Sequence, residues 1–255
     1  MRILLSNDDG IYSEGIQVLK EHLDSIAEVI VIAPDRERST ISHAITLRKP
    51  LNLKEVKTNG KTWGFSVNGT PADCIIAGLL EVMKDKKPDL IVSGINHGPN
   101  LGNDIFYSGT VGAAMEGAMR NIPSLAVSIN SSKDFKFESA AQYTKEIVYN
   151  LTKQNLPNNL LLNINFPNVE YVDLQGIQII RHGQRKYQDE LFKISDPKGK
   201  VHYWLGGEID HESIEKNTDY GTVHNKKVSI TPILLDLTDY KMMSKMKKWI
   251  GNWNL

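Results

Sequence analysis

The chain has little cysteine and no excess of charge of either sign. Cys74 is the single cysteine among 255 residues, and 30 Lys and Arg side chains balance 30 Asp and Glu side chains. One cysteine excludes an internal disulfide framework and any zinc or iron–sulfur site built from several thiolates. A formal net charge of zero provides no general positive surface for nucleic acid or an anionic membrane. We therefore expect neither as a partner, and a phosphate-bearing ligand needs a local binding site.

The sequence also lacks a long apolar run and an N-terminal secretory signal. Met1 and Arg2 lead directly into a short apolar segment at residues 3–5, which cannot cross a bilayer. We predict a soluble, cytoplasmic protein. A chain of this length suits one large α/β domain, so we treat residues 1–255 as a single domain.

Short apolar segments alternate with helical patterns over the first two-thirds of the chain. Residues 3–5, 28–33 and 89–93 have the continuous apolar character of parallel strands that are buried on both faces. Residues 14–26 carry apolar side chains at steps of three and four, which is typical of an amphipathic helix. This alternation predicts an α/β fold with a doubly wound, mostly parallel sheet. Further strands are expected at 123–129 and 159–164, a hairpin around Asn59-Gly60, and further helices at about 70–84, 111–120 and 137–151.

The last third of the chain changes character. Residues 184–225 mix aromatic, charged and turn residues without a steady period, and they are too many for a simple loop. We interpret 184–225 as a β-hairpin arm whose aromatic side chains pack against another subunit. Residues 226–255 return to a strand at 228–235 and a terminal helix at 239–250, whose lysines we interpret as a solvated face.

Two neighbouring carboxylates follow the first strand. Asp8 and Asp9 lie before Gly10, which allows the chain to turn, so that both could converge on one cation. Without a cation, each negative charge raises the cost of ionising the other. The alternative is that the pair only forms a turn or caps the next helix, as Asn-Asp-Gly clusters often do.

Three more polar segments are expected at the same edge of the sheet, where open α/β sheets bind their ligands. Ser39 lies in the loop after the second strand, Asn96 follows the strand at 89–93, and Ser108-Gly109-Thr110 begins a helix. Hydroxyl, amide and carboxylate oxygens suit Mg2+, Mn2+ or Ca2+. The helix start offers free N–H groups and a positive dipole end to a phosphate. Together these groups suit phosphoryl hydrolysis.

Short polar and glycine-rich blocks recur in order along the chain. They read SNDDG at 6–10, APDRERS at 33–39, GTPADC at 69–74, SGIN at 93–96, GPNLG at 98–102 and YSGTV at 107–111. Each block is similar to one of the SurE family, the stationary-phase survival proteins that are 5'/3'-nucleotidases, and VSITP at 228–232 fits as well. The resemblance covers most of the chain. It departs mildly at Thr40, where the family often has Gly, and at Ser13-Glu14, where Ala-Pro is more common.

The resemblance implies a phosphatase that needs one divalent metal ion, Mg2+ or Mn2+, and releases phosphate from nucleoside 5'- and 3'-monophosphates. Polyphosphate is a possible second substrate, and Ca2+ could occupy the metal site. The implied metal ligands are Asp8, Asp9, Ser39 and Asn96, with Asp8 and Asp9 also catalytic. We add Asn100, Ser108, Gly109 and Thr110 as candidate contacts to phosphate or substrate. The resemblance further implies a Rossmann-like core with a protruding hairpin, and homodimers or homotetramers that exchange C-terminal elements.

Several alternatives stay open. Asp8 or Asp9 is nucleophile, base or ligand only, and we favour attack by a water that the ion activates, with one of the two carboxylates assisting. His97 is a general acid or base, or it is only a neighbour or a contact to substrate. A phosphatase of the haloacid dehalogenase type is disfavoured, because that type has an Asp-x-Asp motif, whereas Asp8 and Asp9 are adjacent here. The competing hypothesis is a regulatory module that binds nucleotide and metal without turnover.

Overall fold

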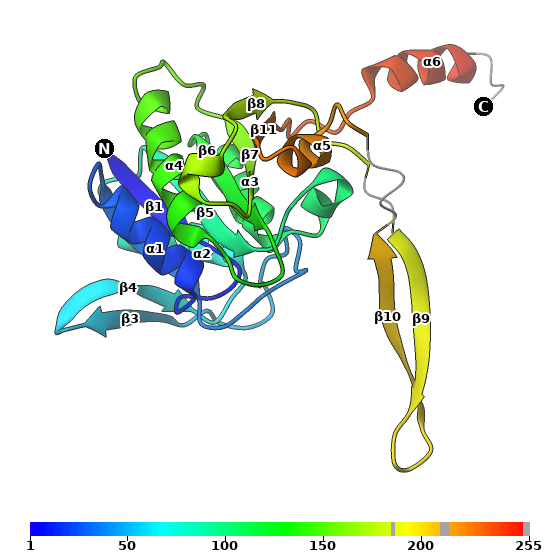
Figure 1. Ribbon diagram of the computed structural model, residues 1–255, viewed down its shortest axis with the longest axis horizontal. Helices are drawn as coiled ribbons and strands as arrows, with labels where there is room; N and C mark the ends of the chain where they lie inside the picture. Colours follow the sequence, from blue (N-terminus) through cyan, green and yellow to red (C-terminus); the bar gives the residue numbers. More distant parts are fainter. Residues whose placement is uncertain (185–186, 210–214, 252–255) are drawn as a thin grey trace.

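The computed structural model describes residues 1–184, 187–209 and 215–251. Within them, one sheet of nine strands runs in the order β3-β4-β2-β1-β5-β6-β7-β11-β8, and a separate hairpin pairs β9 with β10 (Figure 1). The strands are β1 (Arg2–Ser6), β2 (Glu28–Pro34), β3 (Leu53–Thr58), β4 (Lys61–Val67), β5 (Leu90–His97), β6 (Ser124–Asn130), β7 (Leu161–Pro167), β8 (Ile177–Ile179), β9 (Tyr187–Ser195), β10 (Val201–Ile209) and β11 (Val228–Pro232). The α-helices are α1 (Glu14–Leu23), α2 (Pro71–Ala77), α3 (Gly109–Met119), α4 (Phe137–Leu151), α5 (Asp219–His224) and α6 (Tyr240–Ile250). Shorter helical turns are η1 (Gly78–Val82), η2 (Gly102–Phe106) and η3 (Tyr171–Asp173).

The centre of the sheet is parallel, as predicted. Strand β3 pairs antiparallel with β4, and β11 pairs antiparallel with β7 and parallel with β8. The six strands between them, β4, β2, β1, β5, β6 and β7, all run in one direction. Their carboxyl ends therefore lie at one edge, where a parallel sheet of this kind binds ligands. The doubly wound α/β fold is confirmed.

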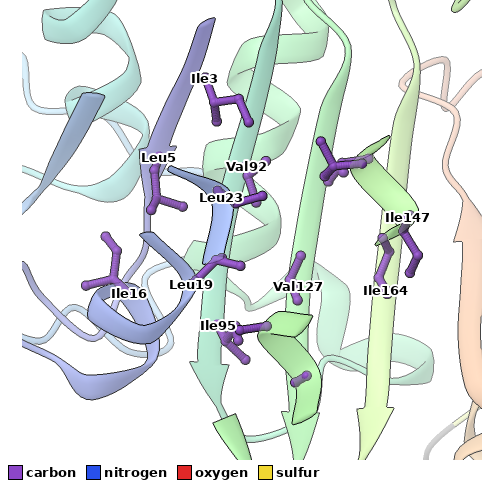
Figure 2. Packing of buried hydrophobic residues seen from close by; sticks show 14 of the residues in the cluster. Ile3, Leu5, Ile16, Leu19, Leu23, Val92, Ile95, Val127, Ile147 and Ile164 are labelled. Atoms are coloured by element: carbon purple, nitrogen blue, oxygen red, sulfur yellow. The ribbon is translucent and has the colours of Figure 1, made fainter. Parts of the chain in front are cut away.

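Helices cover both faces of this sheet. Along β1, Ile3 and Leu5 pack into the cluster under α1 and α4, whereas Leu4 packs on the opposite side. Figure 2 shows Ile3 and Leu5 in the first cluster with Leu19 and Leu23 of α1. All of these side chains are fully buried. Because such burial contributes roughly 1.5–3 kcal/mol per large apolar side chain, the two clusters hold the strand ends rigidly.

Local signals in the sequence identified most elements correctly. Asn59 and Gly60 have φ of 52° and 76° and connect β3 to β4, as the Asn-Gly pair predicts. Thr70 caps α2 in a capping box with Asp73, since the Thr70 hydroxyl accepts from the Asp73 N–H and the Asp73 carboxylate accepts from the Thr70 N–H. Cys74 is buried in this helix, as expected.

Strand β5 differs from the prediction. It continues from Leu90 to His97, beyond the expected end at Ser93, so Asn96 lies on strand rather than in a loop. Pairing with β6 shifts register between Ser93 and Asn96, where Gly94 has φ of 140°. A Cβ at Gly94 would lie 2.3 Å from the Val127 oxygen, so glycine permits this close approach. The short helix α5 is also absent from the prediction, because six residues are too few to establish a helical period.

The hairpin β9–β10 and helix α6 extend away from the sheet (Figure 1). The segments 185–186 and 210–214 of the predicted arm lie outside the described residues. Helix α6 contains no buried residue. Large apolar side chains are exposed on the hairpin at Leu191, Phe192, Ile194, Val201, Tyr203, Trp204 and Leu205. Among the described helices, none has the length and apolar character needed to span a bilayer.

Candidate functional site

A polar cavity of about 330 Å³ lies at the carboxyl edge of the parallel strands. Among the residues that line it are Asp8, Ser39, Asn96, Asn100 and Ser108. They come from four stretches of the chain, because Asn96 and Asn100 belong to the single stretch 96–100, and the fold brings these stretches together. Three further candidates contact the lining residues: Asp9 contacts His97, and Gly109 and Thr110 contact Asp8.

Asp8 is buried against the start of α3. Its carboxylate accepts a hydrogen bond from the Thr110 hydroxyl, and the Thr110 backbone N–H adds a second bond. A Cβ at Gly109 would lie 2.9 Å from both Cβ and Oδ2 of Asp8. Only glycine at 109 therefore lets the helix begin this close to the carboxylate.

The surroundings of Asp8 disfavour its negative charge. Asp8 is 4% exposed. Burial, followed by the charge of Asp9, raises its pKa to about 7, against the opposing effect of the Thr110 hydrogen bonds. A cation beside this pair would favour the ionised form, so the electrostatics suit a metal ligand.

Asp9 contacts the end of β5. Its Oδ2 accepts from the His97 N–H at 3.3 Å, and its Oδ1 lies 3.6 Å from His97 Nδ1. Burial, followed by the charge of Glu37, raises the pKa of Asp9 to about 7. The two carboxylates therefore receive hydrogen bonds from opposite sides, one from α3 and one from β5.

The His97 ring belongs to an aromatic stack. Its centroid lies 5.1 Å from that of Phe135 and 5.0 Å from that of Phe137. Burial lowers the pKa of His97, which favours the neutral imidazole. The stack fixes the ring beside Asp9 and the cavity.

Ser39 and Asn96 present oxygen atoms to the cavity. The Ser39 hydroxyl donates to Glu37 Oε1 at 2.6 Å, which leaves the lone pairs of its oxygen for a cation. Asn96 Nδ2 donates to the Gly98 carbonyl at 2.7 Å, so the amide oxygen is the end of the side chain that this bond does not use.

The loop that carries Ser39 is anchored at several points along its length. The Arg38 N–H donates to the Asp8 carbonyl at 2.7 Å, and the Ser42 N–H donates to the Tyr107 carbonyl at 2.9 Å. Thr46 N–H donates to a carboxylate oxygen of the α2 capping box at 3.0 Å. These bonds hold the segment in one conformation although it has no regular secondary structure, so that Ser39 lies at the cavity.

A buried carboxylate on α3 holds the same loop. Glu116 is 7% exposed and accepts from His43 Nε2 at 2.8 Å and from Arg120 Nε at 2.7 Å. The His43 hydrogen bond, as the largest cause, lowers the pKa of Glu116. The ionised carboxylate thus ties the loop to the helix that contacts Asp8.

Side chains of β6 and β7 form hydrogen bonds with Asn100. Asn165 Oδ1 accepts from the Asn100 N–H at 2.8 Å, and Asn165 Nδ2 donates to the Asn100 carbonyl at 3.1 Å. Asn100 Nδ2 donates to Ser128 Oγ at 2.7 Å. Neither Asn165 nor Ser128 is expected at the site from the sequence, although Asn163 and Asn165 at alternate positions of an otherwise apolar strand are an available signal.

Ser108 caps α3, because its Oγ accepts from the Val111 N–H at 3.1 Å. With the Thr110 N–H and hydroxyl both directed at Asp8, the N–H of Gly109 is the donor at this helix start that we consider for an anion.

The donor set fits a hard divalent cation. Within the described residues, no third carboxylate, imidazole or thiolate joins Asp8 and Asp9 in a cluster that could hold a metal ion. Further ligands would therefore be neutral oxygens, such as those of Ser39 and Asn96, or water. Oxygen-only sites with few carboxylates are typical of Mg2+ and Mn2+.

Comparison with known proteins agrees with this geometry. The family model described as "Survival protein SurE" matches residues 3–189. A protein named 5'-nucleotidase SurE from Aquifex aeolicus is 44% identical over 96% of this chain and 96% of its own, and one from Kosmotoga olearia is 44% identical over the whole of both. The crystal structure of the SurE protein from Aquifex aeolicus superposes with a TM-score of 0.87, at 43% identity, covering 98% of this chain and all of the other. Since the family model covers residues 3–189 and relatives that are 44% identical align over nearly the whole chain, this chain belongs to the SurE family.

Proposed function

We propose that this chain is a divalent-metal-dependent 5'-nucleotidase, which hydrolyses nucleoside 5'-monophosphates to nucleoside and phosphate. The observation that carries the proposal is the buried carboxylate of Asp8 at a polar cavity of about 330 Å³, with the partly buried carboxylate of Asp9 next to it in the chain. Curated relatives that align over nearly the whole chain are named 5'-nucleotidase SurE, which supports the same activity.

Asp8, Asp9, Ser39 and Asn96 would hold one Mg2+ or Mn2+ ion, and Ca2+ could occupy the same ligands. When bound, the ion supplies charge neutralisation at the phosphate oxygens and lowers the pKa of a water ligand. Asp8 and Asp9 must release their protons to bind it, which their raised pKa values of about 7 allow near neutral pH.

Asn100, Ser108, Gly109 and Thr110 would bind the phosphate or position the groups that do. The Gly109 N–H and the positive end of α3 favour an anion. One N–H of the Asn100 amide donates to Ser128 Oγ, so the second N–H can donate to the phosphate. The hydroxyl of Thr110 acts through Asp8, whose carboxylate it contacts.

We extend the substrate range to nucleoside 3'-monophosphates and polyphosphate, and the assembly to a homodimer or homotetramer. The exposed apolar side chains of the hairpin support association through the arm, since such surfaces normally become buried against a partner. We place the protein in the cytoplasm.

The experiment measures inorganic phosphate released from 5'- and 3'-monophosphates and from polyphosphate, with Mn2+, with Mg2+ and with EDTA. We expect metal-dependent release by the wild type and by a matched control, Asp85→Asn, whose side chain is exposed. We expect Asp8→Ala and Asp9→Ala to lose most of it. If nucleotide binds but no metal supports release, the chain is a regulatory module that binds without turnover.

A further inference from the structure

Asp219 is a fully buried carboxylate outside the metal site. It lies at the start of α5, shortly after the hairpin arm, and is 0% exposed. Its Oδ2 accepts from the Gly102 N–H at 2.8 Å, and its Oδ1 accepts from the N–H groups of Gly183 at 2.9 Å and Tyr220 at 2.8 Å. Two of these donors are remote in sequence, so the carboxylate joins three segments of the chain.

The first remote donor belongs to the loop that borders the cavity. Gly102 ends the GPNLG block at 98–102 and has φ of 54°. Two residues earlier, the backbone of Asn100 is clamped by Asn165. The loop is therefore held at two points by buried side chains from other elements. Neither point involves Asp8 or the end of β5.

The second remote donor belongs to the root of the arm. Gly183 precedes β9, and a Cβ built on it would lie 3.0–3.1 Å from the side chain of Thr218. The Asp219 N–H also donates to the Arg181 carbonyl at 3.1 Å. Asp219 thus holds the arm root twice: its carboxylate, which also holds Gly102, accepts from Gly183, and its backbone N–H donates to Arg181.

An ionised carboxylate is suited to this junction, because it offers two acceptor oxygens and strong hydrogen bonds to N–H groups. An amide has a single acceptor oxygen, and its NH2 group would face a backbone N–H at the other end. The asparagine variant therefore breaks the junction with almost no change in volume.

We propose that Asp219 is a positioning residue, which couples the root of the hairpin arm to the 98–102 loop and thereby sets the affinity for the phosphate of the substrate. The proposal rests on the proposed function, because it assigns the loop to the substrate side of that site. It predicts that disturbing the arm root alters the loop while Asp8, Asp9 and Asn96 keep their geometry.

The test compares Asp219→Asn with Asp196→Asn. Asp196 also accepts two backbone N–H bonds, from Lys198 and Lys200 at 2.9 Å each, but at the tip of the same arm. Amide hydrogen exchange of the full-length protein, followed by mass spectrometry, reports on residues 98–106 without requiring catalysis. We expect exchange in this segment to become about tenfold faster in Asp219→Asn, with residues 2–6 unchanged, and no change in Asp196→Asn.

Kinetics provide the second readout. We expect KM for a nucleoside monophosphate to rise about tenfold in Asp219→Asn, while the Mn2+ concentration for half-maximal activity is unchanged. A purely structural loss would instead weaken substrate and metal together. Gly183→Ala is a second variant, which pushes on Thr218 at the arm root and leaves the carboxylate intact, so it tests the coupling even if Asp219→Asn does not fold.

Unchanged exchange at 98–106 in both Asp219→Asn and Gly183→Ala overturns the proposal. A rise in exchange over the whole chain, or parallel loss of substrate and metal affinity, overturns it as well. If the wild type releases no phosphate from any nucleotide, the proposed function fails, yet the exchange experiment still decides whether the loop and the arm root are coupled.

Discussion

Replacing Asp8 by Asn should stabilise the metal-free protein while it abolishes activity. Burial and the charge of Asp9 raise the pKa of Asp8 from 3.8 to about 7. A group whose pKa is raised by folding contributes stability at acid pH, and that contribution is lost as the pH rises from its unfolded pKa through its folded one. Above pH 7 the folded protein must therefore hold an unfavourable charge that asparagine does not carry.

The size of the effect follows from the shift. Three pKa units correspond to at most about 4 kcal/mol at 1.36 kcal/mol per unit. Because Asp8 lines a cavity that water can enter, we expect roughly half of this, about 2 kcal/mol of unfolding free energy. For a chain of this length that is a rise in Tm of about 4 °C or more. Asparagine retains an oxygen that can accept from the Thr110 hydroxyl, so this contact is kept.

Thermal denaturation of the wild type and Asp8→Asn with EDTA, at pH 8 and at pH 5, measures this stabilisation. Asp85→Asn is the control for loss of an exposed charge. The gain of Asp8→Asn should be largest at pH 8 and clearly smaller at pH 5, where the folded protein keeps the Asp8 proton and only the unfolded chain is ionised. Added Mn2+ should raise the Tm of the wild type and not of the variant. An equal gain at both pH values, or a loss at pH 8, would show that the charge of Asp8 is not the source of the instability.

Three further predictions concern the helix start and the arm. Gly109→Ala places a methyl group 2.9 Å from the Asp8 side chain and should lower the free energy of unfolding, measured with denaturant, by about 1–3 kcal/mol. The loss of phosphatase kcat/KM, expressed as a free energy, should be larger than this loss of stability. Thr110→Val removes the hydroxyl hydrogen bond that lowers the pKa of Asp8, so the acid limb of the pH–rate profile should move to higher pH, and an unmoved limb would contradict this role. Trp204→Glu adds charge to an exposed face of the hairpin and should reduce the mass seen by light scattering to that of a smaller assembly, whereas an unchanged mass would argue against association through the arm.

Local patterns in the chain were sufficient for most of the fold. Continuous apolar runs predict buried parallel strands, and the regular spacing at 14–26 predicts α1, because each signal depends on neighbours within a few residues. The same is true of the Asn59-Gly60 turn. The extension of β5 to His97 was missed, since it depends on the approach of Gly94 to β6, a contact between segments that are distant in sequence.

For the candidate site too, part could be predicted from the sequence and part depends on the tertiary structure. By itself, the sequence determined which candidate side chains meet at one edge of the sheet, because Asp8, Ser39 and Asn96 each lie at or after the carboxyl end of a strand in a parallel sheet. Only the tertiary structure decided how those side chains are held and charged. Burial raises the pKa of Asp8, Gly109 permits the contact with α3, and the Asp219 carboxylate accepts from Gly102, which lies 117 residues earlier in the chain. Burial and contacts of this kind arise when remote segments pack together, and no local pattern encodes them.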